Sequence, residues 1–99
     1  MPRTVEGGAG AHHRARADLD HRLQARALVL ALRPDVSADL AAESLVAMAG
    51  PTPAAPIAVR RALERLESAH GVRPNPLTGR AVEALALALG RVGAGRSRA

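Results

Sequence analysis

Apolar residues recur at helical spacing in four stretches of the chain, and prolines and glycines separate these stretches. Spacings of three and four residues bring side chains to one face of an α-helix. The stretches cover about residues 18–33, 37–49, 57–70 and 75–92. The pattern therefore predicts an all-α fold, a small bundle of about four helices.

The same spacing predicts which side chains face the core. They are Leu19, Leu23, Ala27 and Leu30 in the first helix, Leu40, Ala41, Leu45 and Met48 in the second, Val59, Ala62, Leu63, Leu66 and Ala69 in the third, and Ala81, Val82, Leu85, Leu89 and Val92 in the fourth. Alanine buries little area, so we expect such a core to give a thin margin of stability.

Local signals predict where the first two helices begin and end. Asp18 and Asp20 open the first helix, where carboxylates suit the helix dipole. Ser37 is a good N-cap for the second helix, and Gly50 is a good stop for it. The proline-rich stretch 51–56 that follows predicts a stiff connector that cannot continue a helix.

Other signals predict the turn between the last two helices. Gly71 followed by Val72 indicates a Schellman cap, in which Val72 folds back onto Leu66. Asn75 or Thr78 can then cap the fourth helix.

Both ends of the chain lack apolar periodicity and are rich in glycine and arginine. Residues 1–17, which include Arg14 and Arg16, predict a flexible basic arm, and residues 93–99 predict a flexible tail. The predicted domain organisation is therefore one helical domain, residues 18–92, with a disordered basic segment on each side.

Composition excludes several classes of function. The 99 residues contain no cysteine and no aromatic residue, which excludes a disulfide framework, thiolate chemistry and base-stacking platforms. The longest apolar run, residues 27–32, is much shorter than a membrane span, so we expect a cytoplasmic protein without a membrane partner.

The sequence contains no pattern typical of an enzyme or of a metal site. Its serines lack the context of an activated nucleophile, and His12, His13 and His21 lack the spacing of metal ligands. We therefore predict no catalytic residue, no metal and no cofactor.

All 14 basic residues are arginine, and the net charge is +5. The preference for arginine and alanine is typical of a bacterium with a GC-rich genome, so placement is more informative than the total. Residues 34–56 carry a net −3, whereas residues 57–73 carry a net +2. The second predicted helix is thus acidic and the third is basic.

The third predicted helix carries Arg60, Arg61 and Arg65 on one face, opposite its apolar face. The stretch 57–72, IAVRRALERLESAHGV, resembles the recognition helix of GntR-type winged-helix regulators, although no wing follows it. The resemblance implies a helix-turn-helix-like regulatory or accessory protein that binds double-stranded DNA through these three arginines. Arg14 and Arg16 would add contacts to the DNA backbone.

A second hypothesis rests on apolar residues that the core does not need. Leu28, Leu32 and Leu87 point away from the predicted core faces. Soluble monomers avoid large exposed apolar patches, so these leucines indicate a surface for a second copy or for another protein. The chain would then be a non-enzymatic helical adaptor, as a homodimer or with another protein, and its arginines would only keep the surface solvated. Both hypotheses stay open from the sequence.

Overall fold

The computed structural model describes the backbone of residues 18–98 and the side chains of residues 18–93. Within that range the chain is all α-helical, with no strand. The first helix covers residues 18–31 and is followed by α2 (Ala38–Ala49), α3 (Ala55–Val72) and α4 (Pro76–Arg98). The predicted small all-α bundle is confirmed.

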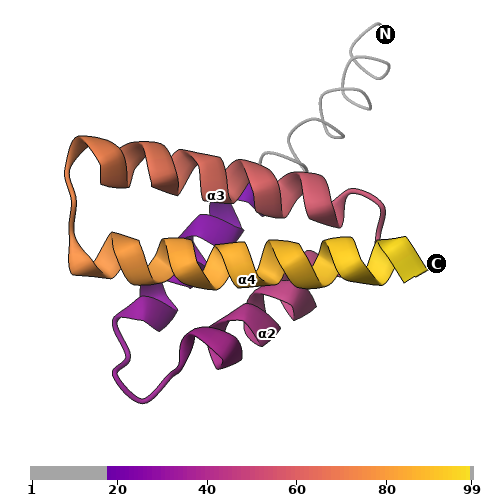
Figure 1. Ribbon diagram of the computed structural model, residues 1–99, viewed down its shortest axis with the longest axis horizontal. Coiled ribbons are helices and arrows are strands. Elements are labelled where there is room, and N and C mark those ends of the chain that lie inside the picture. Colours follow the sequence, from indigo (N-terminus) through magenta and orange to yellow (C-terminus); the bar gives the residue numbers. More distant parts are fainter. Residues whose placement is uncertain (1–17, 99) are drawn as a thin grey trace, which may run out of the picture.

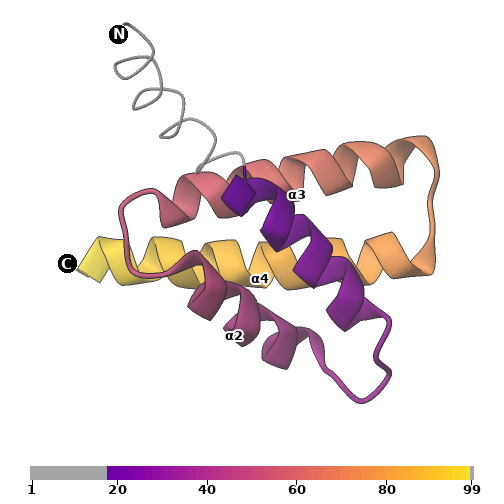
Figure 2. The same cartoon turned by 180° about the vertical axis from the view of Figure 1, so that it is seen from behind.

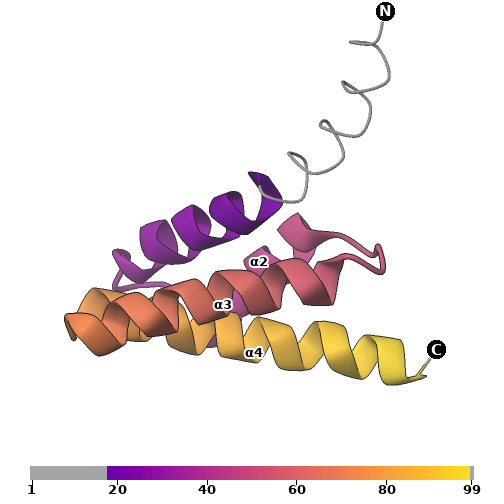
Figure 3. The ribbon, with the colours of Figure 1, turned by 90° about the horizontal axis from the view of Figure 1, so that it is seen from above.

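The long helices α3 and α4 lie antiparallel, side by side, and form one layer (Figure 1). The first helix and α2 form the second layer and cross one face of that pair (Figure 2). Seen from above, the first helix lies obliquely over α3, and α2 is largely hidden behind α3 (Figure 3). The acidic helix α2 packs mainly on α4 and makes only a small contact with α3.

The core between the layers is built mostly from small side chains. Of its 17 buried hydrophobic residues, 11 are alanine, and the larger ones are Leu23, Leu45, Val59, Leu63, Leu66 and Leu85. Alanine lets helix backbones approach closely but removes little apolar area from water. We therefore expect a small free energy of unfolding, so that a single unfavourable buried group has a measurable effect on it.

Most of the predicted core faces are observed, with two corrections. Leu40 is 54% exposed and Ala69 is also exposed, although both were expected inside. In α2 the buried face consists instead of Ala41, Ala42, Leu45 and Ala49. Packing on α4 turns α2 so that alanines rather than Leu40 make the close contact.

The predicted ends of α2 are confirmed. The Ser37 Oγ accepts a hydrogen bond from the Leu40 amide at 3.1 Å and so caps the helix. Gly50 ends it with a φ of 80°, a backbone conformation that favours glycine.

The predicted ends of α3 are wrong at both sides. The helix starts at Ala55, so Pro56 lies inside its first turn, where the amide that proline lacks would have no helical partner. At the other end the helix continues through Gly71 to Val72, and no Schellman cap forms. Val72 is 85% exposed instead of folding back onto Leu66.

The fourth helix begins as predicted but ends later. The Asn75 Oδ1 accepts a hydrogen bond from the Leu77 amide at 2.7 Å, which confirms Asn75 as a cap. The helix α4 then runs to Arg98, beyond the expected end near Val92, because glycine weakens a helix without stopping it. The predicted arm, residues 1–17, lies outside the described residues.

Candidate binding site

The basic face of α3 is exposed, as the periodicity predicts. Arg60, Arg61 and Arg65 all reach solvent. Arg61 and Arg65 also line an open hollow of about 380 Å³, together with Glu64 and Ser68. These arginines are therefore accessible to a partner.

The helix α3 lies between two different neighbours, α4 and α2, with which it makes contacts of different extent. In a helix-turn-helix the two helices of the motif are joined by a short turn and pack against each other. Here α2 packs mainly on α4, while α3 pairs with α4 in a long antiparallel hairpin. The resemblance of residues 57–72 to a recognition helix stays a prediction.

Positive and negative charges nearly balance within residues 18–93. Residues 18–93 hold nine arginines and eight carboxylates, a net +1, and the other +4 of the chain lie in residues 1–17 and 94–99. Arg14 and Arg16, the arginines expected to contact DNA from the arm, lie outside the described residues. The bundle itself therefore presents little excess positive charge.

The most unusual polar group in the described residues is the carboxylate of Asp20, on the first helix. Its side chain is only 1% exposed, and neither of its oxygens has a hydrogen-bond partner among the residues that the structure describes. In the described part of the chain, Asp20 pairs with Arg65, whose Nη2 lies 3.8 Å from Oδ2, an ion-pair distance too long for a hydrogen bond.

Burial disfavours the charged form of a carboxyl group. Desolvation accordingly raises the pKa of Asp20 above its ordinary value of 3.8, and the positive charges of Arg65, Arg61 and His21 oppose this rise only in part. Two of the three arginines of the basic face, Arg65 and Arg61, therefore act electrostatically on the buried carboxylate.

Asp20 lines a pocket of about 380 Å³ between the first helix and the start of α3. The apolar lining consists of Leu19, Pro53, Ala54, Ile57 and Ala58. The polar lining consists of Asp20, Thr52 and Arg61. The pocket thus combines a mostly apolar wall with one buried acceptor and one cationic donor.

Local sequence explains how this wall is built. Pro53 and Pro56 restrict the backbone where α3 begins. Because the helix starts at Ala55, Ile57 and Ala58 lie on its first turn. Ala58 is buried, whereas Ile57 is 54% exposed at the rim. The proline-rich stretch is therefore part of the pocket as well as a connector.

From the sequence, Asp20 is predicted only to suit the helix dipole and is not identified as a site residue. A signal was present, because Asp20 lies three residues before Leu23 and seven before Ala27, on the same stripe. Leu23 and Ala27 are fully buried. A carboxylate in register with such a stripe indicates an inward-facing acid.

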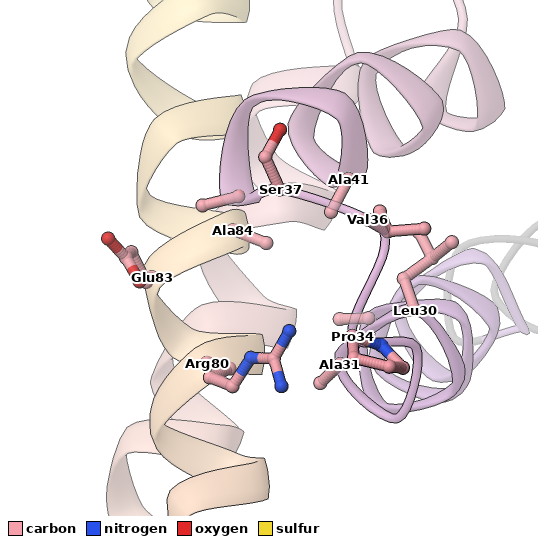
Figure 4. A pocket seen from close by; sticks show the side chains of 11 residues that line it. Leu30, Ala31, Pro34, Val36, Ser37, Ala41, Arg80, Glu83 and Ala84 are labelled. Atoms are coloured by element: carbon pink, nitrogen blue, oxygen red, sulfur yellow. The ribbon is translucent and has the colours of Figure 1, made fainter.

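A smaller pocket of about 190 Å³ lies where the loop after the first helix meets α4 (Figure 4). Arg80 reaches across it toward Ala31 and Pro34, while Glu83 points away (Figure 4). The Arg80 Nη2 donates to the Arg33 carbonyl oxygen at 3.3 Å. The main polar group of this pocket already ties the loop to α4, so we assign it a structural role.

The leucines predicted to form a partner surface have different environments. Leu28 packs partly against the core, whereas Leu32 is 67% exposed and Leu87 is 37% exposed. The other exposed large hydrophobic residues are Val29, Leu40, Ile57 and Val72. Of the exposed apolar residues, Ile57 is the one that borders the Asp20 pocket.

No helix in the described part of the chain has both the length and the hydrophobicity needed to cross a membrane. Among these same residues, no three histidine or acidic side chains are grouped in a way that could hold a metal ion. Comparison with protein-family models finds no matching family, and comparisons with curated proteins and with solved structures find no match.

Proposed function

We propose that this chain is a non-enzymatic helical module that binds another protein, and that it does so at the pocket between the first helix and α3. The observation that carries the proposal is the Asp20 carboxylate, which is buried in the lining of a mostly apolar pocket and has no hydrogen-bond partner within residues 18–93. Buried polar groups are nearly always paired, and an unpaired one calls for a specific explanation.

The cost of burying Asp20 supports a functional explanation. A desolvated carboxylate without hydrogen bonds destabilises a fold, and a core rich in alanine offers little to offset it. Residues that lower stability are typical of binding sites, where activity and stability conflict. A partner whose binding uncovers the Asp20 carboxylate and supplies a hydrogen-bond donor would remove this penalty.

The dimensions of the pocket favour a protein partner. A volume of about 380 Å³ is near the lower end of the range for small-molecule sites, roughly 300–1,000 Å³. It suits one or two side chains of a larger surface, and Ile57 extends the apolar wall toward solvent. Central apolar contacts with a few polar groups are typical of protein interfaces.

Binding of duplex DNA is the second candidate function. It is favoured by the exposure of Arg60 and Arg61, neither of which has an ion-pair partner among the described residues. Arg65 is shared with Asp20, and most of the excess charge lies outside the bundle. DNA binding would then depend largely on the terminal arginines and would weaken steeply with salt.

A pair of matched variants tests the proposed function. Ile57 and Leu40 are both 54% exposed, and each is the third residue of its helix, but only Ile57 borders the pocket. The full chain serves as bait in the source cells, and each captured protein is purified and its affinity measured. We expect a partner whose affinity falls about tenfold or more with Ile57→Glu and stays unchanged with Leu40→Glu.

DNA binding is measured in parallel, with a random-sequence duplex at low and moderate salt. The wild type is compared with the Arg61→Ala/Arg65→Ala double variant. Strong salt-dependent binding by the wild type, together with the absence of any partner sensitive to Ile57→Glu, would replace the proposed function by the second candidate. Loss of that binding in the double variant would assign the DNA contact to α3 rather than to the terminal arginines.

A further inference from the structure

An open groove of about 550 Å³ lies along the exposed face of the first helix, beside α2. It is lined by Arg22, Ala25, Arg26 and Val29 of the first helix and by Met48 of α2. Val29 is 55% exposed, and Leu32, three residues further along the same helix face, is 67% exposed. The single chain thus leaves an apolar strip on this face open to water.

The charged side chains of this groove are all positive. Within residues 18–93, no carboxylate lines the groove, and neither Arg22 nor Arg26 has an ion-pair partner. These two arginines are four residues apart on the helix, so their like charges are neighbours. A surface that covers the groove should therefore combine apolar side chains with a carboxylate.

The exposed face of α2 has this combination. Leu40, Glu43 and Ala47 are spaced by three and four residues, and all three are exposed on the side opposite the buried residues of the helix. The helix α2 contains no basic residue, and Glu43 has no ion-pair partner in the described part of the chain. These three residues form an apolar and acidic stripe, here called the α2 stripe.

We propose that the chain forms a symmetric dimer in which the α2 stripe of each copy docks into the groove of the other copy. Within one chain the stripe and the groove are both exposed, so they do not cover each other. Both belong to the layer formed by the first helix and α2, on its side away from α3 and α4 (Figure 2). A two-fold axis across this layer makes each contact twice, and two-fold symmetry is the commonest arrangement of protein dimers.

Other pairings of the same two surfaces match less well. Groove against groove would bring Arg22 and Arg26 close to the same arginines of the second copy. Stripe against stripe would bring Glu43 close to its own counterpart. Like charges that face each other across an interface oppose association. The reciprocal pairing instead joins opposite charges and covers Val29 and Leu40, which are 55% and 54% exposed in the single chain.

Charge reversal tests this pairing, with sedimentation equilibrium of the full chain from micromolar to millimolar concentration. Arg22→Glu/Arg26→Glu reverses the groove, and Glu43→Arg reverses the α2 stripe. Each variant alone should dimerise about tenfold or more weakly than the wild type, because like charges then meet at both contacts. An equal mixture of the two variants should form a mixed dimer with nearly wild-type affinity, because each groove then meets a stripe of opposite charge.

Matched controls change the net charge by the same amounts outside both surfaces. They are Arg60→Glu/Arg73→Glu for the groove variant and Glu67→Arg for the stripe variant, all at exposed positions of α3 or directly after it. Dimer affinity should stay unchanged in both controls. Circular dichroism checks that every variant keeps its helical content.

Three results would each overturn the proposal. The first is a chain that stays monomeric over the whole concentration range. The second is a dimer that neither charge reversal weakens. The third is a mixture of the two variants that dimerises no better than either alone, which would show that the groove and the α2 stripe do not meet.

This dimer goes beyond the proposed function, because the groove and the Asp20 pocket share no lining residue. Leu40→Glu should weaken the dimer and leave the affinity of a partner for the Asp20 pocket unchanged, when that affinity is measured at concentrations where the chain is monomeric. Ile57→Glu should do the reverse. Failure of the dimer and failure of the proposed function are therefore separate results.

Discussion

Polar groups at the two ends of α3 differ in their hydrogen bonding. Near its start, the Asp20 carboxylate is buried against the helix and has no hydrogen-bond partner. Near its end, the His70 Nδ1 lies 2.8 Å from the Thr78 Oγ1, and that hydroxyl donates to the Asn75 carbonyl oxygen at 3.0 Å. The polar groups at the end of α3 are hydrogen-bonded to one another, whereas the Asp20 carboxylate near its start has no such bond within the described residues.

The contrast distinguishes polar groups that stabilise the fold from polar groups that are available to a partner. At the His70 end, each polar group named above is satisfied within the turn that joins α3 to α4, so its role is to fix the hairpin. The same chain could have placed an apolar side chain at position 20 to match Leu23 and Ala27. The carboxylate there is consistent with a group held for an external donor.

The largest expected effect comes from removing the open acceptor. Asp20→Leu should raise the free energy of unfolding at neutral pH by about 1–3 kcal/mol, because the desolvation cost disappears and apolar contact is gained. Asp18→Leu, on the exposed neighbouring carboxylate, should change it by less than about 0.5 kcal/mol. Urea unfolding of both variants measures the difference. A loss of stability in Asp20→Leu would show that the carboxylate supports the fold.

The next prediction concerns pH. Burial raises the pKa of Asp20 in the folded protein, so the folded state holds this proton more strongly than the unfolded chain does. The penalty is therefore full above the folded pKa, shrinks as pH falls through it, and vanishes below the unfolded value near 3.8. The stability advantage of Asp20→Leu over the wild type should decrease on acidification. An advantage that is constant or grows at low pH would contradict the raised pKa.

At the closed end, removing a satisfied group should lower stability. Asn75→Ala deletes the acceptor that caps the Leu77 amide at 2.7 Å and should cost about 1 kcal/mol, as for other N-cap residues. Thermal unfolding measures the loss. Asn75→Asp keeps the acceptor and should retain most of the stability. If Asn75→Ala and Asp20→Leu shifted stability in the same direction, the comparison between the two ends would fail.

The smallest expected effect is the coupling between Asp20 and Arg65. Their charged atoms are 3.8 Å apart, and the Arg65 side chain is about half exposed, so solvent screens the interaction. A double-mutant cycle with Asp20→Asn and Arg65→Gln should give a coupling energy below about 1 kcal/mol. A much larger coupling would mean that Arg65 already satisfies the carboxylate and that the pocket needs no partner.

Much of the fold could be predicted from local pattern, and the errors have identifiable causes. The Ser37 and Asn75 caps were found because a side-chain acceptor before a helix acts over two or three residues. The early start of α3 was missed because proline was interpreted as a helix breaker, although the first turn tolerates it. Gly71 was interpreted as a stop, yet its backbone remains helical.

Only part of the candidate site could be predicted from the sequence. Arg61 and Arg65 were identified from their spacing on the exposed face of α3. Asp20 lay on a recognisable apolar stripe, but Thr52 and Pro53 join it only through the packing of the first helix against the start of α3. No local pattern contains that long-range contact.

Sequence by itself determined that the chain is helical, which residues share a helix face, and that the basic residues of the third helix reach solvent. Tertiary structure decided that α2 packs on α4 rather than on α3, and that Asp20 is buried while Asp18 is exposed. The physical reason is that periodicity fixes which side chains point the same way along one helix. What those side chains meet depends on how the helices are placed against one another, and that placement turns one of two neighbouring carboxylates into a candidate binding group.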